Sequence, residues 1–248
     1  MTMEAFSLPP MKTRILSLLL GGFVLAAPLQ AAQLGSERLS YRWKLQGGIS
    51  WLASLAFPSS GKGTLETHEA DTVNSRLMIS ADPKSYYLYE SSMLPSGTKT
   101  LTSRSAYSYG SSSRDERVAF DLAKGLTRVQ KTTNEGQETK VRKLESQTPQ
   151  DVLTAIYYLR QHAAEITAPV KAEVFSGAKG YDMVYQPLPM TTMNGMRVRP
   201  FTMKAVGDDA KKFPGEVRVW LSDDDRRVPV RIDIEQKYGA TLKLDLER

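Results

Sequence analysis

The sequence predicts a mainly β protein, with a curved antiparallel sheet or incomplete β-barrel and one main α-helix. Three observations lead to this class. Several segments alternate apolar and polar residues with a period of two, which is typical of half-buried strands. Only one segment, 148–161, spaces its apolar residues as a helix does. No linker rich in Pro, Gly or Ser divides residues 32–248, so we expect a single domain there.

The strongest strand pattern opens this domain. Residues 38–46 read RLSYRWKLQ, with Leu39, Tyr41, Trp43 and Leu45 alternating with polar residues. The same alternation returns in three runs at the other end of the domain, 217–221, 228–234 and 242–246. Polar turn sequences, SDDDRR and Lys237-Tyr238-Gly239, separate these runs. The C-terminal third is therefore predicted to be a meander of antiparallel hairpins.

Weaker strand signals fill the middle of the chain. They lie at 64–69, 75–80, 86–91, 117–121, 127–132, 138–144, 171–175, 181–186 and 197–206. Asn134-Glu135-Gly136 predicts a hairpin turn between two of them. Residues 103–114, SRSAYSYGSSSR, are interpreted as the most loop-like stretch of the domain.

The predicted helix at 148–161 has a recognisable start. Thr148 offers a capping hydroxyl, Pro149 suits the first helical position, and Asp151 adds an acid to the first turn. We expect about four helical turns. Such a helix should pack on one face of the sheet or plug one end of a curved one.

The helix also has a predicted buried face. Its apolar stripe contains Val152, Ile156 and Leu159, which we expect to be buried. Gln150 and Gln161 lie off this stripe and are expected to be exposed.

Residues 1–31 predict a secretory signal peptide. Lys12 and Arg14 precede an apolar run at 15–27, and small residues follow up to the expected cleavage site after Ala31, with Ala32 as the alternative. Residues 1–10 fit no part of a signal, so we expect the true start to be Met11. The apolar run is shorter than the ~20 residues that span a bilayer. The mature protein is therefore predicted to be periplasmic and not an integral membrane protein.

The composition of the chain indicates which classes of partner and which stabilising interactions to expect. The chain has no cysteine, so burial and backbone pairing must stabilise it. Its net charge of +6 comes from basic residues that occur at most in pairs, which favours a solvated surface over a patch for anionic lipid. No motif interleaves aromatic and basic residues, so nucleic acid is not an expected partner.

Catalytic motifs are not found. His68 and His162 are the only imidazoles, and neither lies in a nucleophile elbow or a His-Glu-x-x-His motif. Asp223, Asp224 and Asp225 occupy one predicted turn, where short acidic side chains stabilise the bend. We interpret the protein as non-enzymatic and without a cofactor, with a hydrolase as the less favoured alternative.

Methionine gives the sharpest metal hypothesis. Met190, Met193 and Met196 are spaced three apart, and thioethers favour Cu(I). The alternative is that Asn194-Gly195 forms a hairpin turn and that the methionines are simply its apolar face.

Aromatic residues give the hypothesis for a ligand site. Trp43, Trp51, Tyr86, Tyr87 and Tyr89 would form core and sheet face in a closed structure, but they would line a cavity in an open, curved one. Trp43, Tyr87 and Tyr89 are the candidate ligand-binding residues.

Two segments carry a family resemblance. TPQDVLTAIYYLRQ at 148–161 and VWLSDDDRRVPVRIDIEQKYGATLKLDL at 219–246 resemble signatures of the exported bacterial family called domain of unknown function 3108. The resemblance implies an exported, β-rich domain over residues 32–248, and it supplies no catalytic residues. The order of elements is also similar to the half-barrels of lipoprotein carriers of the LolA type.

These observations favour an exported envelope protein that binds an apolar or amphipathic, lipid-like molecule in a concave sheet. The reasoning is that one amphipathic helix is too small to cover so much sheet, which would leave an apolar face open for binding. The alternative is a structural or interaction module whose partner is another envelope protein.

Overall fold

The computed structural model describes residues 36–47, 58–177, 179–212, 215–235 and 240–247. The chain divides into two compact units, 1–30 and 31–248, and all described residues belong to the second. The predicted signal peptide, Trp51 and the predicted turn at 237–239 lie outside the described residues.

The described strands form one sixteen-stranded sheet. In chain order its elements are β1 (Glu37–Gln46), β2 (Ser60–Glu69), β3 (Val73–Asp82), β4 (Ser85–Met93), β5 (Thr100–Tyr109), β6 (Ser112–Asp121), β7 (Leu126–Thr133), β8 (Gly136–Lys143), β9 (Gln150–Asp151), β10 (Val170–Ser176), β11 (Lys179–Pro187), β12 (Thr191–Met193), β13 (Met196–Ala205), β14 (Glu216–Ser222), β15 (Pro229–Glu235) and β16 (Thr241–Leu246). The described helices are α2 (Val152–His162) and the short α3 (Asp209–Lys212).

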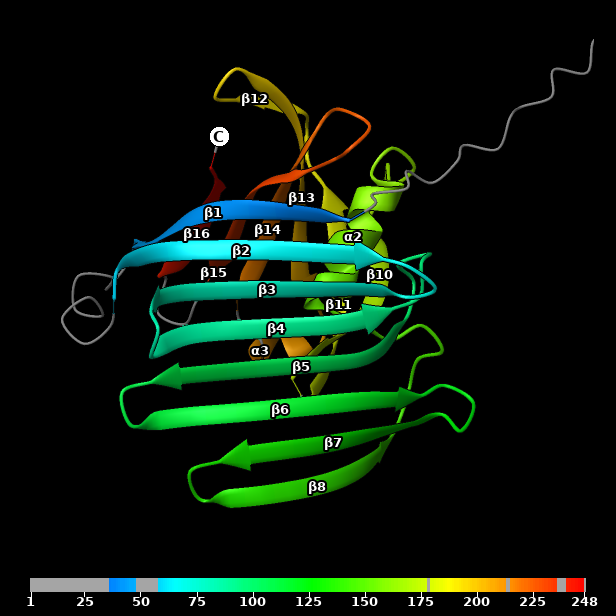
Figure 1. The fold of residues 1–248 in the computed structure, drawn as a ribbon. Coiled ribbons are helices and arrows are strands. Elements are labelled where there is room, and N and C mark those ends of the chain that lie inside the picture. The colour runs from blue at the N-terminus through cyan, green and yellow to red at the C-terminus, as the bar shows by residue number, and fades with distance from the viewer. Residues whose placement is uncertain (1–35, 48–57, 178, 213–214, 236–239, 248) are drawn as a thin grey trace, which may run out of the picture. The chain divides into compact units, whose positions relative to one another are not determined.

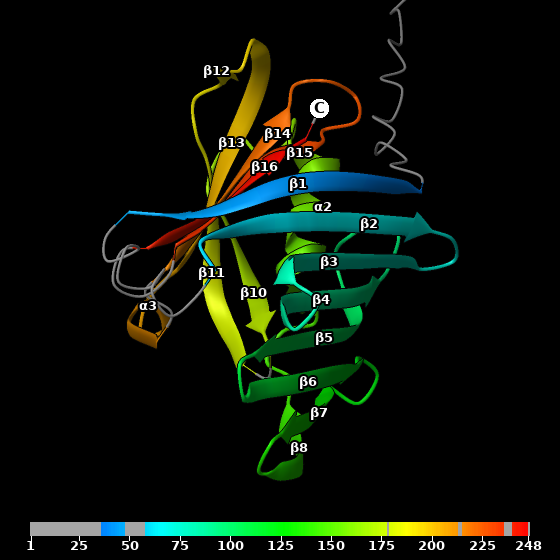
Figure 2. The ribbon, with the colours of Figure 1, turned by 60° about the vertical axis from the view of Figure 1, so that its left-hand side comes forward.

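Two meanders make up the sheet. β1–β8 pair in sequence order, and β16, β15, β14, β13, β11, β10 and β9 continue from β1 in the other direction. The antiparallel pairing of β1 with β16 joins them. β8 lies at one end of the strand order and β9 at the other, so the sheet is not closed. In Figures 1 and 2 the second meander crosses behind the first, and α2 lies between them.

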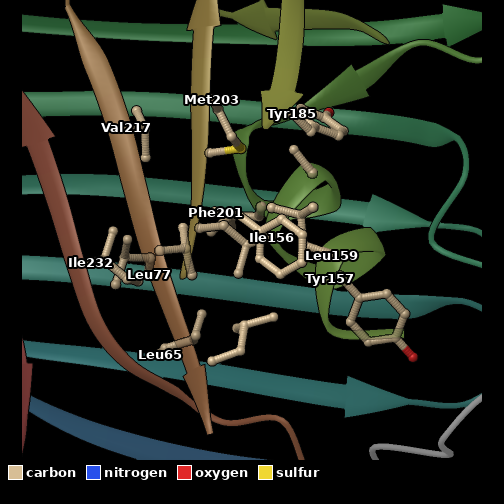
Figure 3. Close-up of a cluster of buried hydrophobic side chains, with 14 of the residues drawn as sticks. Leu65, Leu77, Ile156, Tyr157, Leu159, Tyr185, Phe201, Met203, Val217 and Ile232 are labelled. Atoms are coloured by element: carbon tan, nitrogen blue, oxygen red, sulfur yellow. The ribbon is translucent and has the colours of Figure 1, made fainter. Parts of the chain in front are cut away.

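The main core fills the space around α2. Leu65 and Leu77 from the first meander, Phe201 and Val217 from the second, and Ile156 from the helix belong to one buried cluster, as Figure 3 shows. Each of these side chains is at most 4% exposed. The concave face of this part of the sheet is therefore covered, and α2 is a central element of the core.

A second, smaller cluster lies farther along the sheet. It contains Val118 and Phe120 of β6, Val129 of β7, Phe175 of β10, and Leu144, which follows β8. The rings of Phe120 and Phe175 meet edge to face with centroids 4.9 Å apart. This cluster holds strands β5–β8, hereafter the β5–β8 extension, against β10.

The mainly β class and the curved, open sheet are confirmed. All thirteen segments predicted as strands lie in strands, with β14–β16 as the expected C-terminal meander. The interpretation of residues 103–114 as a loop was wrong, because they form the hairpin of β5 and β6. Serine and tyrosine on a strand whose inner face is not in the main core produce no apolar alternation.

The predicted start of the helix was also wrong. The helix begins at Val152, its cap is Asp151, and Oδ1 of Asp151 accepts a hydrogen bond of 2.7 Å from the backbone N–H of Thr154. The helix has 11 residues, which corresponds to three turns rather than four. The segment before it extends as β9, so Thr148 does not cap the helix.

Burial of the helix is more complete than predicted. Ile156 and Leu159 are buried as expected, whereas Val152 is only half-buried. Gln150 and Gln161 are buried, so the expectation that they are exposed was wrong. The reason is that both meanders enclose the helix. Gln161 donates to the carbonyl of Pro95 at 2.9 Å, and Gln150 accepts from the hydroxyl of Tyr185.

A buried arginine ties the helix to both meanders of the sheet. Arg160 is 1% exposed, forms an ion pair with Glu37 of β1, and donates to the carbonyls of Arg226 and Arg227 at 3.1 and 3.0 Å. Arg227 returns the contact by donating to the carbonyl of Arg160 at 3.0 Å. We call this cluster the arginine clasp. It fixes the C-terminal end of α2 to the β14–β15 turn.

Candidate ligand groove

A groove of about 440 Å³ lies on the concave side of the β5–β8 extension, facing the turn between β10 and β11. Tyrosines and charged residues form most of its walls. The lining residues are Tyr87, Tyr89, Ser105, Ala106, Tyr107, Arg114, Glu116, Val129, Lys131, Glu138, Lys140, Arg142, Ser176, Gly177, Lys179 and Tyr181. Its volume is within the ~300–1,000 Å³ range of small-molecule sites.

Strand register explains why these residues gather. Tyr89 lies opposite Ser105, and Ser105 lies opposite Glu116 on the next strand. Glu116 in turn lies opposite Lys131, and Lys131 lies opposite Glu138. Residues directly opposite each other project from the same face of a sheet, so this row crosses the concave face from β4 to β8.

Tyrosines form one side of the groove. Tyr87 lies opposite Tyr107, and their ring centroids are 6.0 Å apart. Burial raises the pKa of Tyr87, and the neighbouring Tyr107 and Tyr109 raise it further. Burial likewise raises the pKa of Tyr89. These phenols are therefore neutral at physiological pH and present both a ring face and a hydrogen-bonding hydroxyl.

Basic residues outnumber acidic ones in the groove. Arg114, Lys131, Lys140, Arg142 and Lys179 are opposed by only Glu116 and Glu138. Arg114 pairs with the buried Glu116, and Lys140 pairs with Glu138. The hydrogen bond from Lys140 lowers the pKa of Glu138, so this carboxylate stays ionised. Lys131 lies between both glutamates, each of which already has a cation as partner. The excess of positive charge favours an anionic ligand.

A glycine allows the β10–β11 turn to close over the groove. Gly177 has a φ of +60°, and a Cβ at this position would lie 2.1 Å from Oε2 of Glu116. Any larger residue would be strained and would displace the Glu116 carboxylate from its place beside Arg114. The turn and the sheet are thus fitted to each other at this point.

The comparisons with known proteins fit this architecture. Residues 50–247 match the family described as "Protein of unknown function (DUF3108)". The chain belongs to this DUF3108 family. No curated protein matches the sequence.

Solved structures resemble the fold. A β-barrel-like protein of the DUF1849 family from Brucella abortus shares 12% identity with this DUF3108 protein at a TM-score of 0.58, covering 88% of this chain and 98% of that one. A putative outer membrane lipoprotein-sorting protein domain from Vibrio parahaemolyticus matches with 8% identity and a TM-score of 0.25, over 87% and 84% of the two chains. The first likeness supports the barrel-like fold, and the second is too low to support an argument.

The two segments that resemble DUF3108 signatures meet in space. Arg160, from the helix segment, binds the carbonyls of Arg226 and Arg227, from the C-terminal segment. Their contact is the arginine clasp. The resemblance is thus carried by residues that hold the fold together.

Of the predicted ligand residues, the structure brings Tyr87 and Tyr89 together in the groove. Trp43 lies elsewhere, because it is buried on β1, where its Nε1 donates to the carbonyl of Ser80 at 3.0 Å. Tyr107, Tyr181 and the basic residues were not predicted. The alternation of Tyr107 and Tyr109 with serines was a signal that could have identified β5.

The expected open apolar face is not found in the described residues. Their exposed large hydrophobic side chains are Tyr87, Val141, Met190 and Met196, which are scattered over three regions. Val129 is the one aliphatic side chain among the groove residues that the register directs into the groove, because Ala106 lies between the groove-facing Ser105 and Tyr107 and projects from the other face. The expectation was wrong because it took the helix as a cover on one sheet, whereas the two meanders also cover each other.

A larger hollow of about 700 Å³ lies on the opposite, convex face of β2–β7. Oppositely charged side chains cross this face as a ladder, in which Arg76 pairs with Glu66 at 3.7 Å and with Glu90 at 3.3 Å. Arg104 pairs with Glu90 at 3.0 Å and with Asp115 at 2.6 Å. Arg117 and Arg128 also line this hollow, but no tyrosine does, so the convex hollow offers charge without aromatic rings and is a weaker candidate than the groove.

The imidazoles have local partners. Ser36 Oγ lies 2.8 Å from Nδ1 of His68, and Glu165 Oε2 lies 2.8 Å from Nδ1 of His162. Within the described ranges, no three His, Asp or Glu side chains are placed to hold a metal ion. None of the helices in the described part of the chain is long and apolar enough to cross a membrane.

The acidic turn is stabilised by its own side chains. Oδ1 of Asp224 accepts from the hydroxyl of Ser222 at 2.7 Å and from the backbone N–H of Arg227 at 3.0 Å. Asp223 pairs with Arg197 at 3.3 Å. The interpretation of this segment as a structural turn is confirmed.

The methionine segment forms the predicted hairpin. Met193 lies opposite Met196, and Asn194 and Gly195 have φ values of 50° and 77°. Met190 has its sulfur 3.7 Å from a guanidinium nitrogen of Arg199. The structure thus places two of the three methionines side by side, and copper binding stays a prediction.

Proposed function

We propose that this DUF3108 protein is an exported, non-enzymatic envelope protein that binds the anionic head of an amphipathic, lipid-like molecule in the groove of the β5–β8 extension. The observation that carries the proposal is the pairing of tyrosine rings with an excess of basic side chains in one concave site. Export rests on Lys12, Arg14 and the apolar run that follows them.

Each wall of the groove contributes a different interaction. The rings of Tyr87 and Tyr107 offer flat apolar surface for stacking against a sugar or an acyl stem, and their hydroxyls offer hydrogen bonds. Lys131 and Lys179 offer ammonium groups to a phosphate or carboxylate. The combination favours a ligand that carries both kinds of group.

The head of the ligand fits the groove better than its hydrocarbon chains. Val129 is the one aliphatic side chain that the register directs into the groove, and transfer of a hydrocarbon chain from water needs apolar walls, at about 25 cal/mol per Å² buried. The main core, which has such walls, is already filled by α2. We therefore expect the chains to stay outside the groove.

The test uses the purified mature protein and two soluble lipids with identical chains, dihexanoyl phosphatidylglycerol and dihexanoyl phosphatidylcholine. Calorimetric titration should show saturable, micromolar binding of the anionic lipid and at least tenfold weaker binding of the zwitterionic one. Saturable binding that does not distinguish the two lipids, or no binding of either, would contradict the proposal.

Matched variants locate the site. Replacing Lys131 and Lys179 by Gln should weaken binding of the anionic lipid about tenfold, the loss of roughly 1.4 kcal/mol of charge-assisted interaction. The control replaces Lys62 and Lys84, which are exposed and outside the groove, by Gln. It removes the same charge and should bind as the unmodified protein does.

A further inference from the structure

Strand β8 is an open edge of the sheet. It pairs with β7 on one side, and it stands at the end of the strand order on the other. All eight of its residues, Gly136–Lys143, are exposed. Figure 1 shows it at the end of the β5–β8 extension, away from α2.

This edge lacks two of the devices that usually block an edge strand. β8 contains no proline, and its register with β7 runs without a bulge from Thr133 opposite Gly136 to Leu126 opposite Lys143. Alternate residues of an antiparallel edge strand direct their N–H and C=O groups outward, where they can pair with another strand. The charged side chains of β8 therefore determine which strand can pair with this edge.

We propose that β8 pairs antiparallel with β8 of a second copy of the chain, with Thr139 on the two-fold axis. Thr139 then lies opposite Thr139 of the partner subunit, and Glu138 lies opposite Lys140 of the partner subunit. The two-fold axis creates this Glu–Lys pair twice. The proposal does not rest on the ligand groove.

Charge selects this register over its neighbours. Moving the axis by one residue toward either end brings Lys140 opposite Lys140 of the partner subunit or Glu138 opposite Glu138 of the partner subunit. Like charges directly opposite each other destabilise a sheet, and opposite charges stabilise it. Glu138 is ionised, since the hydrogen bond from Lys140 lowers its pKa, so the charges that this choice needs are present.

The proposed dimer has a structural consequence. Glu138 and Lys140 line the groove, so both intersubunit pairs lie on its side of the sheet. The grooves of the two subunits would meet along the two-fold axis. The interface consists of one strand from each subunit, which is small compared with a standard interface of about 1,600 Å², so the dimer should be weak and salt-sensitive.

Sedimentation equilibrium of the purified mature protein tests the association. We expect a monomer–dimer equilibrium in the micromolar range that shifts toward monomer between 0.05 and 0.5 M NaCl, roughly from 14 Å to 4 Å of Debye length. Glu138→Lys should weaken dimerisation at least tenfold. The double variant Glu138→Lys with Lys140→Glu should restore it, because the swapped charges are again complementary. Asp71→Lys, in an exposed turn between β2 and β3, is the control and should dimerise normally.

Disulfide trapping tests the register, because the chain has no cysteine of its own. Opposed residues on antiparallel strands have Cα atoms about 4.5–5.5 Å apart, within the range that a disulfide spans. Thr139→Cys should therefore form a covalent dimer on mild oxidation. Gln137→Cys should not, since its counterpart is Val141 of the partner subunit. A protein that stays monomeric at every concentration, or a dimer that Glu138→Lys leaves unchanged, would overturn the proposal.

Discussion

The two parts of the first meander use equally regular strands for different purposes. On β1–β3 the concave face carries Leu39, Leu65 and Leu77, which are buried against α2 and the second meander. On β6 and β7 the same face carries Glu116 and Lys131 and borders the groove. Backbone pairing is continuous from one part to the other, with local register shifts near the ends of β3 and β4. The side chains of the concave face therefore decide where the sheet becomes core and where it becomes a candidate site.

Because one part of the sheet packs in the main core and the other borders the groove, substitutions in the two parts should lower the stability of the fold by different amounts. Arg160→Ala, which removes the arginine clasp from the main core, should have the largest effect. It is expected to lower the free energy of unfolding by about 3–5 kcal/mol. The buried Glu37 carboxylate would lose its ion pair with Arg160, and the carbonyl of Arg227 would lose its hydrogen bond. Urea unfolding measures this. Arg226→Ala, at a side chain 69% exposed, is the control and should cost less than about 1 kcal/mol. Equal losses for the two variants would contradict the role of the clasp.

Cavity variants compare the two cores directly. Ile156→Ala, in the main cluster, should cost about 2–5 kcal/mol. Val129→Ala, in the small cluster under the extension, should cost about 1–2 kcal/mol, since two methyl groups at ~0.8 kcal/mol each are removed. Both are measured by denaturant unfolding. A loss below about 1 kcal/mol for Ile156→Ala would show that the helix is peripheral.

The cap of the helix predicts a pH dependence. Burial raises the pKa of Asp151 from 3.8 to about 6, although the N–H groups at the start of the helix act in the opposite direction. Between these values the native state binds more protons than the unfolded state, so this group lowers stability as pH rises from about 4 to 7. Asp151→Asn keeps a capping side chain without a titration. Relative to the unmodified protein, it should gain up to about 3 kcal/mol over this pH range.

The control for that measurement is an exposed aspartate with a shift of opposite sign. Hydrogen bonds, first from the backbone N–H of Lys124, lower the pKa of Asp121. Asp121→Asn should therefore lose stability relative to the unmodified protein as pH rises from 3 to 5. A stability difference between Asp151→Asn and the unmodified protein that is constant from pH 4 to 7 would show that Asp151 is not the responsible group.

The smallest effect is expected on the convex ladder. Arg104→Gln removes pairs with Glu90 and Asp115 that are partly exposed, so it should cost less than about 1 kcal/mol. Arg104 holds the pKa of Asp115 below its usual range. The variant should raise that pKa, as followed by NMR titration of the carboxyl carbon. It should also reduce the loss of stability on acidification, because Asp115 then stabilises the fold less above its usual pKa. An unchanged pKa would contradict this assignment.

The clearest strand patterns in the sequence belong to elements whose side chains meet the main core. Leu39, Tyr41 and Trp43 alternate because one face of β1 is buried and the other is wet. β5 was missed, since its serines and tyrosines face a groove and a charged ladder, and neither produces an apolar period. The N-terminal cap of α2 was predicted at the wrong residue because the segment before the helix forms β9. This strand pairs through two residues with β10, which lies more than twenty positions later in the chain.

The candidate site was harder to predict than the fold. Tyr87 and Tyr89 stand out as aromatic residues on one short segment. Lys131 and Lys179 are ordinary surface residues in the sequence, and only the register of β6–β8 and the β10–β11 turn bring them to the same groove. Long-range pairing therefore creates the charge cluster, and local patterns do not contain it.

The pairing of β1 with β16 sets the order in which the chain can fold. Tyr41 lies opposite Leu246, so this ladder joins strands from the two ends of the described chain. Closing so long a loop costs little more than closing one half as long, about 0.6 kcal/mol per doubling, but contacts of this separation form slowly. Each meander can assemble locally, whereas α2 has its full cover only after β1 and β16 meet. A newly made chain should thus leave α2 incompletely covered until its last strand is available.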